Sequence, residues 1–305
     1  MHRRIPPAAG LALGVGGTAW AAILVRLADE APALAIAGYR MAIAAAILGG
    51  VAIAVVLLRR DRLPARGDFA LLVVSGLFLA AHFWSWFASL ERTSVGSSVV
   101  IVGMQPLLAA LLGLVALRER PVQAEWLGIG LATVGVLIMG GRDFVADPGH
   151  LTGDLLALMG GVFGAAYRTI GRMVRADVTT TVYSGLVYAI AALALWASIA
   201  VTQPTIGGFE GTTWIYLALV ALVPQVIGHT AFNWALAHYR VVTIGIIGLG
   251  EPILATLIAI PVLNENPSLG VVLGGPLVLV GVVVGLHGAA GGTSAAVSRR
   301  RAPTA

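Results

Sequence analysis

The feature that most constrains this chain is a succession of apolar stretches, each long enough to cross a lipid bilayer. A membrane-spanning helix needs about 20 mostly apolar residues, and backbone polar groups inside a bilayer must be satisfied within helices or closed barrels. Short polar or turn-forming segments separate the stretches and leave no room for a further domain. The sequence therefore predicts an all-α integral membrane protein with ten transmembrane helices, at roughly 8–28, 33–58, 68–90, 95–117, 124–141, 152–174, 179–201, 212–236, 241–263 and 269–288.

Composition agrees with a membrane location and argues against several kinds of function. Charged residues make up 11% of the 305 residues, whereas soluble domains carry about 25%. The chain has no cysteine, which excludes disulfides and cysteine-based metal sites. Zinc-protease, nucleophile-elbow and phosphate-loop motifs are missing. We therefore expect no enzyme, no metal and no other cofactor, and transport that does not use ATP.

The basic residues are all arginines, and their distribution predicts the orientation in the membrane. With the N-terminus inside, the inner segments hold fourteen arginines and the outer ends hold three, Arg26, Arg92 and Arg142. Cytoplasmic loops carry an excess of basic residues, so both termini are expected in the cytoplasm, in the inner membrane of a bacterium. The same distribution accounts for the net charge of +5 without nucleic-acid binding.

Three anchors that recur at one offset indicate an internal duplication. An odd number of spans in each half, five, would place the two halves in opposite orientations, which is the inverted-repeat plan of many secondary transporters. The expected domains are residues 1–150 with the first five helices and residues 151–305 with the other five and a short basic tail. The anchors, each pair 146 residues apart, are Gln105–Pro106 with Glu251–Pro252, Glu119 with Glu265, and Pro121 with Pro267.

The later part of each half shows the same pattern, in "ASLERTSVGSSVVIVGMQPLLAALLGLVALRERPVQAEWLGIGLATVGVLIM" at 88–139 and "WALAHYRVVTIGIIGLGEPILATLIAIPVLNENPSLGVVLGGPLVLVGVVVG" at 234–285. A turn with small residues leads into an apolar helix with a proline, a glutamate at its far end, and a glycine-bearing last helix. This pattern resembles the EamA repeat of the drug/metabolite transporter superfamily. The resemblance implies a ten-helix exporter or exchanger of small metabolites with a central cavity between the halves. At Asn264–Glu265–Asn266 the sequence departs from the common pattern, at a helix end.

A carboxylate and a proline stand side by side within the ninth apolar stretch, at Glu251 and Pro252. Pro252 has no N–H for the carbonyl of Gly248 and clashes with it, so we expect a helix kink there, and another at Pro106. Irregular backbone at this depth is tolerated only inside protein or beside a wet cavity. Glu251 then either exchanges a proton or binds a cationic group, or else it is a buried structural hydrogen-bonding group. Gln105 occupies the matching position without a charge.

Two further groups of polar and aromatic residues are candidates for a cavity wall. Gln225, His229 and Asn233 are four residues apart and are expected on one helix face, and His82 and Trp86 have the same spacing in the third stretch. Polar side chains in a lipid-embedded helix face the bundle interior. We favour cavity lining for them over hydrogen bonds between helices.

Roles can be predicted for four more side chains, which are charged or aromatic and lie within the spans. Arg40 lies in the middle of the second stretch and must pair or reach water, so it is expected to bind a substrate carboxylate or to pair with Glu251. Trp20 and Tyr167 are candidates for the cavity wall, with helix packing as the alternative. Arg168 lies about a turn from the inner end and is expected to snorkel to the membrane surface.

Together these features predict a secondary-active transporter that exports a small metabolite, an amino acid or related amphipathic compound, by alternating access. Its expected partners are that substrate, the lipid bilayer and, as candidate coupling ions, protons. Glycine pairs such as Gly281 and Gly285 let helices approach closely, in a monomer or a homodimer. The alternatives are an uncoupled pore or membrane scaffold, and an exchanger of phosphorylated or nucleotide-linked metabolites.

The arginine distribution generates a test of topology. A reporter that is active only in the periplasm, fused after Ala305, should stay inactive, because both termini are expected on the cytoplasmic side. A reporter that is active only in the cytoplasm should give signal at the same position. The opposite pattern of activity would overturn the predicted orientation.

Overall fold

The computed structural model describes residues 7–58, 60–61, 63–93, 98, 101–140, 150–264 and 269–301, and within these ranges the chain is helical without any strand. Seven helical stretches are long and apolar enough to cross a membrane, and two shorter apolar ones are Ile101–Ala116 and Gln123–Met139. A tenth, Leu151–Val174, is less apolar because it contains Asp154, Arg168 and Arg172. The predicted all-α membrane fold is confirmed. The predicted division at residue 150 stays a prediction.

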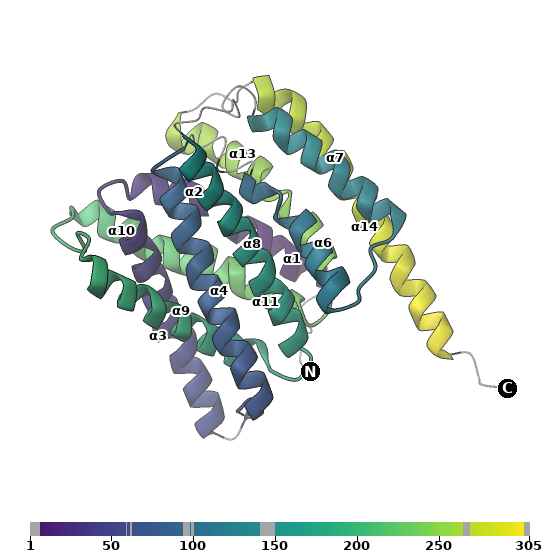
Figure 1. Ribbon diagram of the computed structural model, residues 1–305, viewed down its shortest axis with the longest axis horizontal. Coiled ribbons are helices and arrows are strands. Elements are labelled where there is room, and N and C mark those ends of the chain that lie inside the picture. The colour runs from purple at the N-terminus through teal and green to yellow at the C-terminus, as the bar shows by residue number, and fades with distance from the viewer. Residues whose placement is uncertain are drawn as a thin grey trace.

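Several of the ten spans are built from more than one helical element, and Figure 1 shows their arrangement. The elements are α1 (Pro7–Thr18), α2 (Ala21–Leu27), α3 (Ala33–Leu57), α4 (Arg66–Leu90), α6 (Gln105–Ala116), α7 (Gln123–Gly140), α8 (Leu151–Val174), α9 (Thr180–Thr202), α10 (Gly211–Val220), the π-helix η3 (Ala221–His229), α11 (Thr230–Ala235), α12 (Val241–Gly248), α13 (Glu251–Leu263) and α14 (Leu269–Arg301).

Helices that occupy corresponding places in the two halves pack against each other. The second span pairs with the seventh (α3 with α9), the fourth with the ninth (α6 with α12) and the fifth with the tenth (α7 with α14). The packing of α4 on α8 is mirrored by that of η3 on α1, with the halves exchanged. In Figure 1, α7 and α14 run alongside each other at one edge, away from α3 and α9. Such pairing is what an inverted duplication produces.

The interior and the outer surface of this bundle differ in the way a membrane protein requires. Large side chains such as Phe83, Tyr183 and Tyr188 are fully buried between α3, α4 and α9. Apolar side chains also cover the outside, where Val115 and Val201 are more than four-fifths exposed. Exposed apolar surface of this extent suits contact with lipid rather than water.

Three spans contain a break in the helix. α1 stops at Thr18 before α2 begins, a short helical segment at 101–103 precedes α6, and two residues separate α12 from α13. Pro106 and Pro252 stand in the first turn of α6 and α13, where the missing N–H leaves no hydrogen bond unmade. The kinks predicted at the two prolines are therefore short breaks of one or two residues that keep right-handed helical backbone angles, and Gln105 and Glu251 each begin a new helix.

Close contact between α7 and α14 depends on glycines, as the sequence predicted. A β-carbon added at Gly128 would lie 2.5 Å from the carbonyl oxygen of Gly281 and 2.7 Å from the α-carbon of Gly285. One added at Gly135 would lie 2.7 Å from the carbonyl oxygen of Gly274. Backbone atoms on both sides leave no flexible group that can move aside.

Replacing Gly128 by alanine should therefore destabilise the protein, by about 1–3 kcal/mol as is usual for overpacking. Gly130→Ala is the matched control, because no atom lies within 4 Å of its added β-carbon and alanine is the better helix former. Thermal unfolding in detergent should show a lower midpoint for Gly128→Ala and an unchanged or higher one for Gly130→Ala. Equal midpoints would show that α7 and α14 are not in close contact.

Candidate substrate site

Two cavities meet in the middle of the bundle. The smaller, called here the central cavity, has a volume of about 100 Å³. The larger, the vestibule, has a volume of about 740 Å³ and extends to the end of the bundle that carries Glu30, Glu91 and Leu263. Both cavities are lined by Trp86, Glu251 and Pro252, which therefore mark the passage between them.

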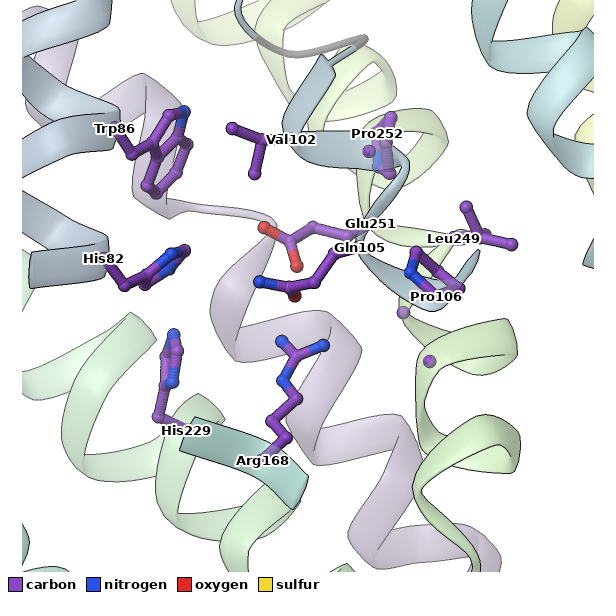
Figure 2. A pocket seen from close by; sticks show the side chains of 13 residues that line it. His82, Trp86, Val102, Gln105, Pro106, Arg168, His229, Leu249, Glu251 and Pro252 are labelled. Carbon is purple, nitrogen blue, oxygen red and sulfur yellow. The ribbon is translucent and has the colours of Figure 1, made fainter. Parts of the chain in front are cut away.

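Seven of the twelve residues predicted for the site or its kinks line the central cavity, together with Arg168 and several apolar or glycine positions, and Figure 2 shows them from close by. The other five line neither the central cavity nor the vestibule. Those that line it are His82, Trp86, Gln105, Pro106, His229, Glu251 and Pro252; those that do not are Arg40, Gln225, Asn233, Trp20 and Tyr167.

Glu251 reaches the central cavity because it is the first residue of α13. At the N-terminus of a helix, the free N–H groups and the helix dipole favour a negative charge. No ion pair joins its carboxylate to any residue that the structure describes, and its hydrogen-bond partner is the neutral side chain of Thr18. Arg168 and Arg40 act on it electrostatically without touching it. The carboxylate is thus in place for a mobile partner.

Arg168 is a cavity residue that the sequence analysis assigned to the membrane surface, and that expectation is wrong. Its side chain is only 9% exposed, and its guanidinium lies in the central cavity with the Phe232 ring 5.4 Å away. It shares a helix face with the buried Gly160, Gly164 and Gly171. This face, rather than the distance to the helix end, determines where the side chain goes, and the glycine spacing is the signal in the sequence that points inward.

Arg40 lies behind the cavity wall, fully buried. Its Nε donates to Gln225 Oε1 over 2.8 Å, and its guanidinium carbon is 4.1 Å from the centre of the Phe83 ring. Among the residues that the structure describes, the two Nη atoms of Arg40 and the Nε2 of Gln225 have no hydrogen-bond partner. Arg40 forms no ion pair with Glu251, so neither of the two roles expected for it is seen in this arrangement.

The three polar residues predicted to share one face of the eighth span, Gln225, His229 and Asn233, lie in different surroundings. η3 contains Pro224 and bonds i to i+5, which changes the angular spacing of its side chains. Gln225 turns to Arg40, and only His229 lines the central cavity. Asn233 accepts from the Tyr167 hydroxyl and donates from Nδ2 to Ser184 and Tyr188, over 3.1 and 3.2 Å.

The Asn233 contacts make Tyr167 part of a buried network between α8, α9 and α11 rather than of a cavity wall. Trp20 lies in the break between α1 and α2, directly before α2, and packs, partly buried, on the main core. Both residues therefore adopt the packing role that was the alternative in the sequence analysis.

An aromatic and imidazole wall closes one side of the central cavity. His82 Nδ1 lies 2.7 Å from the Gly160 carbonyl. A carbonyl can only accept, so Nδ1 carries the hydrogen and the Nε2 of neutral His82 is an acceptor. Trp86 stacks on His82 with ring centres 5.9 Å apart, and its Nε1 has no hydrogen-bond partner in the described part of the chain. The wall thus offers one acceptor and one free donor.

The end of the bundle opposite the vestibule is closed by ion pairs between the halves. Arg172 on α8 pairs with Glu119 over 3.1 Å and donates to the Leu236 carbonyl over 2.8 Å. Arg240 pairs with the fully buried side chain of Glu125. Glu119 and Glu125 flank the connection from α6 to α7, so these contacts join the first half to the second.

Comparison with known proteins places this arrangement among transporters. The sequence model of the EamA-like transporter family matches residues 8–141 and again residues 151–286. A relative in Bacillus subtilis (strain 168), the uncharacterized transporter YyaM, is 25% identical over 81% of this chain and 82% of its own length. The uncharacterized transporter YdeK of the same organism is 26% identical over 80% of this chain and 82% of its own.

A solved crystal structure has the same fold. It superposes with a TM-score of 0.75 over 93% of this chain and 96% of its own, at 20% sequence identity. Likeness at this level of identity concerns the arrangement of the helices alone.

The position of Gln105 depends on Gly164, and this gives a test of the site. A β-carbon at Gly164 would lie 1.9 Å from Gln105 Nε2 and 2.8 Å from His82 Nδ1. Gly164→Ala should displace the flexible Gln105 side chain, and so lower transport at least several-fold, while thermal stability changes little. Gly130→Ala is again the control. Wild-type transport by a folded Gly164→Ala protein would show that Gln105 is not part of the site.

Proposed function

This chain belongs to the EamA-like transporter family, and from that premise we propose that it is a secondary-active exporter of small amphipathic metabolites, such as amino acids or related compounds. It is a multi-pass membrane protein with relatives in bacteria. Its proposed localisation is the inner membrane, with both termini in the cytoplasm. In this proposal it works by alternating access, with Glu251 as the residue that couples substrate movement to protons.

The observation that carries the proposal is the place of Glu251. A carboxylate in the middle of a membrane costs roughly 2.5–3.5 kcal/mol on insertion scales, yet no ion pair with a described residue neutralises this one, and its hydrogen-bond partner Thr18 carries no charge. It also lines both cavities. A group so placed can exchange a proton or a substrate cation as the cavities open and close, which a purely structural carboxylate has no need to do.

The difference between the two ends of the bundle supports alternating access. One end holds the vestibule, and the other is closed by the pairs of Arg172 with Glu119 and Arg240 with Glu125. In the predicted orientation the vestibule faces outward. Each pair joins residues of opposite halves, so movement of one half relative to the other would break these contacts and expose the site inward.

A proton gradient is sufficient for such work. One charge crossing 100 mV supplies about 2.3 kcal/mol, and each 1.4 kcal/mol corresponds to about a tenfold concentration ratio. One proton for each substrate molecule therefore sustains a ratio of several tens.

The exchanger of phosphorylated metabolites is the weaker alternative. Of the two arginines buried within the spans, only Arg168 lines the central cavity, and Glu251 lines the same cavity. A phosphate would meet one arginine and be repelled by a carboxylate. An uncoupled pore, in turn, would tolerate Glu251→Gln with little loss of transport.

Glu251→Gln tests the proposal, since it keeps the size of the side chain and removes its charge. We expect the variant to fold and to lose at least about tenfold of its gradient-driven transport in proteoliposomes, together with the response to a pH gradient. Glu210→Gln, an exposed change at the start of α10, is the control. Wild-type rate and pH response in Glu251→Gln would mean that the carboxylate is structural.

A further inference from the structure

We infer that the central cavity binds the head group of a zwitterion, with the substrate carboxylate on Arg168 and the substrate ammonium on Glu251, while an apolar side chain extends into the vestibule. This inference rests on the proposed function and narrows the substrate to α-amino acids with apolar side chains. It assigns to Arg168 a binding role in place of the membrane-surface position expected from its place in the sequence.

The first argument is that the cavity holds two opposite charges that do not form an ion pair with each other. Arg168 and Glu251 both line it, and they interact electrostatically but form no ion pair. Figure 2 shows the Arg168 side chain pointing toward Gln105 and Glu251 from the opposite side of the cavity. A ligand that carries both charges fits between them, whereas a ligand with one charge leaves the other group unmatched.

The second argument concerns the state of Arg168. It is more than nine-tenths buried, and no carbonyl, carboxylate or hydroxyl of the described residues accepts from its guanidinium. A buried charged group without hydrogen bonds is costly. A carboxylate matches the fork of a guanidinium and can accept two hydrogen bonds from it, so the carboxylate of a bound substrate would remove this cost.

The third argument is the sizes of the two cavities. Pockets for drug-sized ligands have volumes of about 300–1,000 Å³. The central cavity, at about 100 Å³, has room for a small polar head group alone, and the vestibule, at about 740 Å³, has room for the rest. Ile23, Ile36, Leu90 and Ala255 supply apolar wall of the vestibule.

The passage itself suits an ammonium group. Trp86 and Glu251 line it from two sides. An ammonium that binds the carboxylate can also lie near the aromatic ring, which attracts cations. The free Nε1 of Trp86 remains available to a carboxylate oxygen or to water.

Matched ligands separate the two charges in an experiment. L-leucine carries both groups, isoamylamine is leucine without the carboxylate, and isocaproate is leucine without the ammonium. Their binding is measured by competition or thermal shift on the full-length protein in nanodiscs. The variants are Arg168→Gln and Glu251→Gln, with Arg168→Lys to keep the charge and lose the fork, and exposed Arg92→Gln as control.

Wild-type protein and Arg92→Gln should prefer leucine about tenfold or more over each half-ligand, as expected for one charge-assisted contact each. Arg168→Gln should lose the preference for leucine over isoamylamine and keep that over isocaproate. Glu251→Gln should do the reverse, and Arg168→Lys should fall between wild type and Arg168→Gln.

Two outcomes overturn the inference. One is a wild-type protein that binds the three ligands equally or binds none of them. The other is a folded Arg168→Gln protein with unchanged selectivity. If gradient-driven transport of some other metabolite still depends on Glu251 in either case, the proposed function stands and only the zwitterion assignment falls.

Discussion

A helix can stop in the middle of a membrane only where something other than lipid meets its free backbone ends. The rest of this structure follows from that constraint. The breaks before α6 and α13 lie at the central cavity, where Gln105–Pro106 and Glu251–Pro252 line the wall. α13 begins at the central cavity, and the free N–H groups of a helix lie at its start. The free-energy cost of a buried carboxylate is therefore lower there than within an unbroken span. The backbone therefore determines where the charge can stand.

The two halves keep this design but differ in one functional group. Gln105 and Glu251 begin equivalent helices, and both line the central cavity. One is always neutral, and the other can carry a charge. The helix pairing repeats across the halves, so the charge asymmetry is confined to side chains. A carboxylate at only one of the two equivalent positions fits the proposed coupling of one proton to each transport cycle.

Much of the fold and part of the site could be predicted from the sequence. The apolar stretches, the 146-residue offset and the prolines can be read directly from the amino-acid sequence. Seven of the predicted site and kink residues line the central cavity. The remaining residues are placed by the face of the helix on which they lie and by contacts with distant parts of the chain. Arg168 was judged by its distance from the helix end, although its glycine-rich face turns it inward. Gln225 and Asn233 were placed by α-helical spacing, but η3 changes the turn, and Arg40 and Tyr167, far away in sequence, bind them.

The ion pairs that close one end carry a consequence for apparent affinity. In the proposed alternating-access cycle, a state open at that end must give up the contacts of Glu119 with Arg172 and of Glu125 with Arg240. These contacts therefore help to set how much of the protein occupies the state with an accessible vestibule. Apparent affinity from one side equals the intrinsic affinity scaled by the fraction of molecules in the competent state. Residues far from the cavity thus share control of affinity with those that line it, and natural variation at the closed end can adapt a transporter to a new metabolite concentration while its recognition chemistry stays the same.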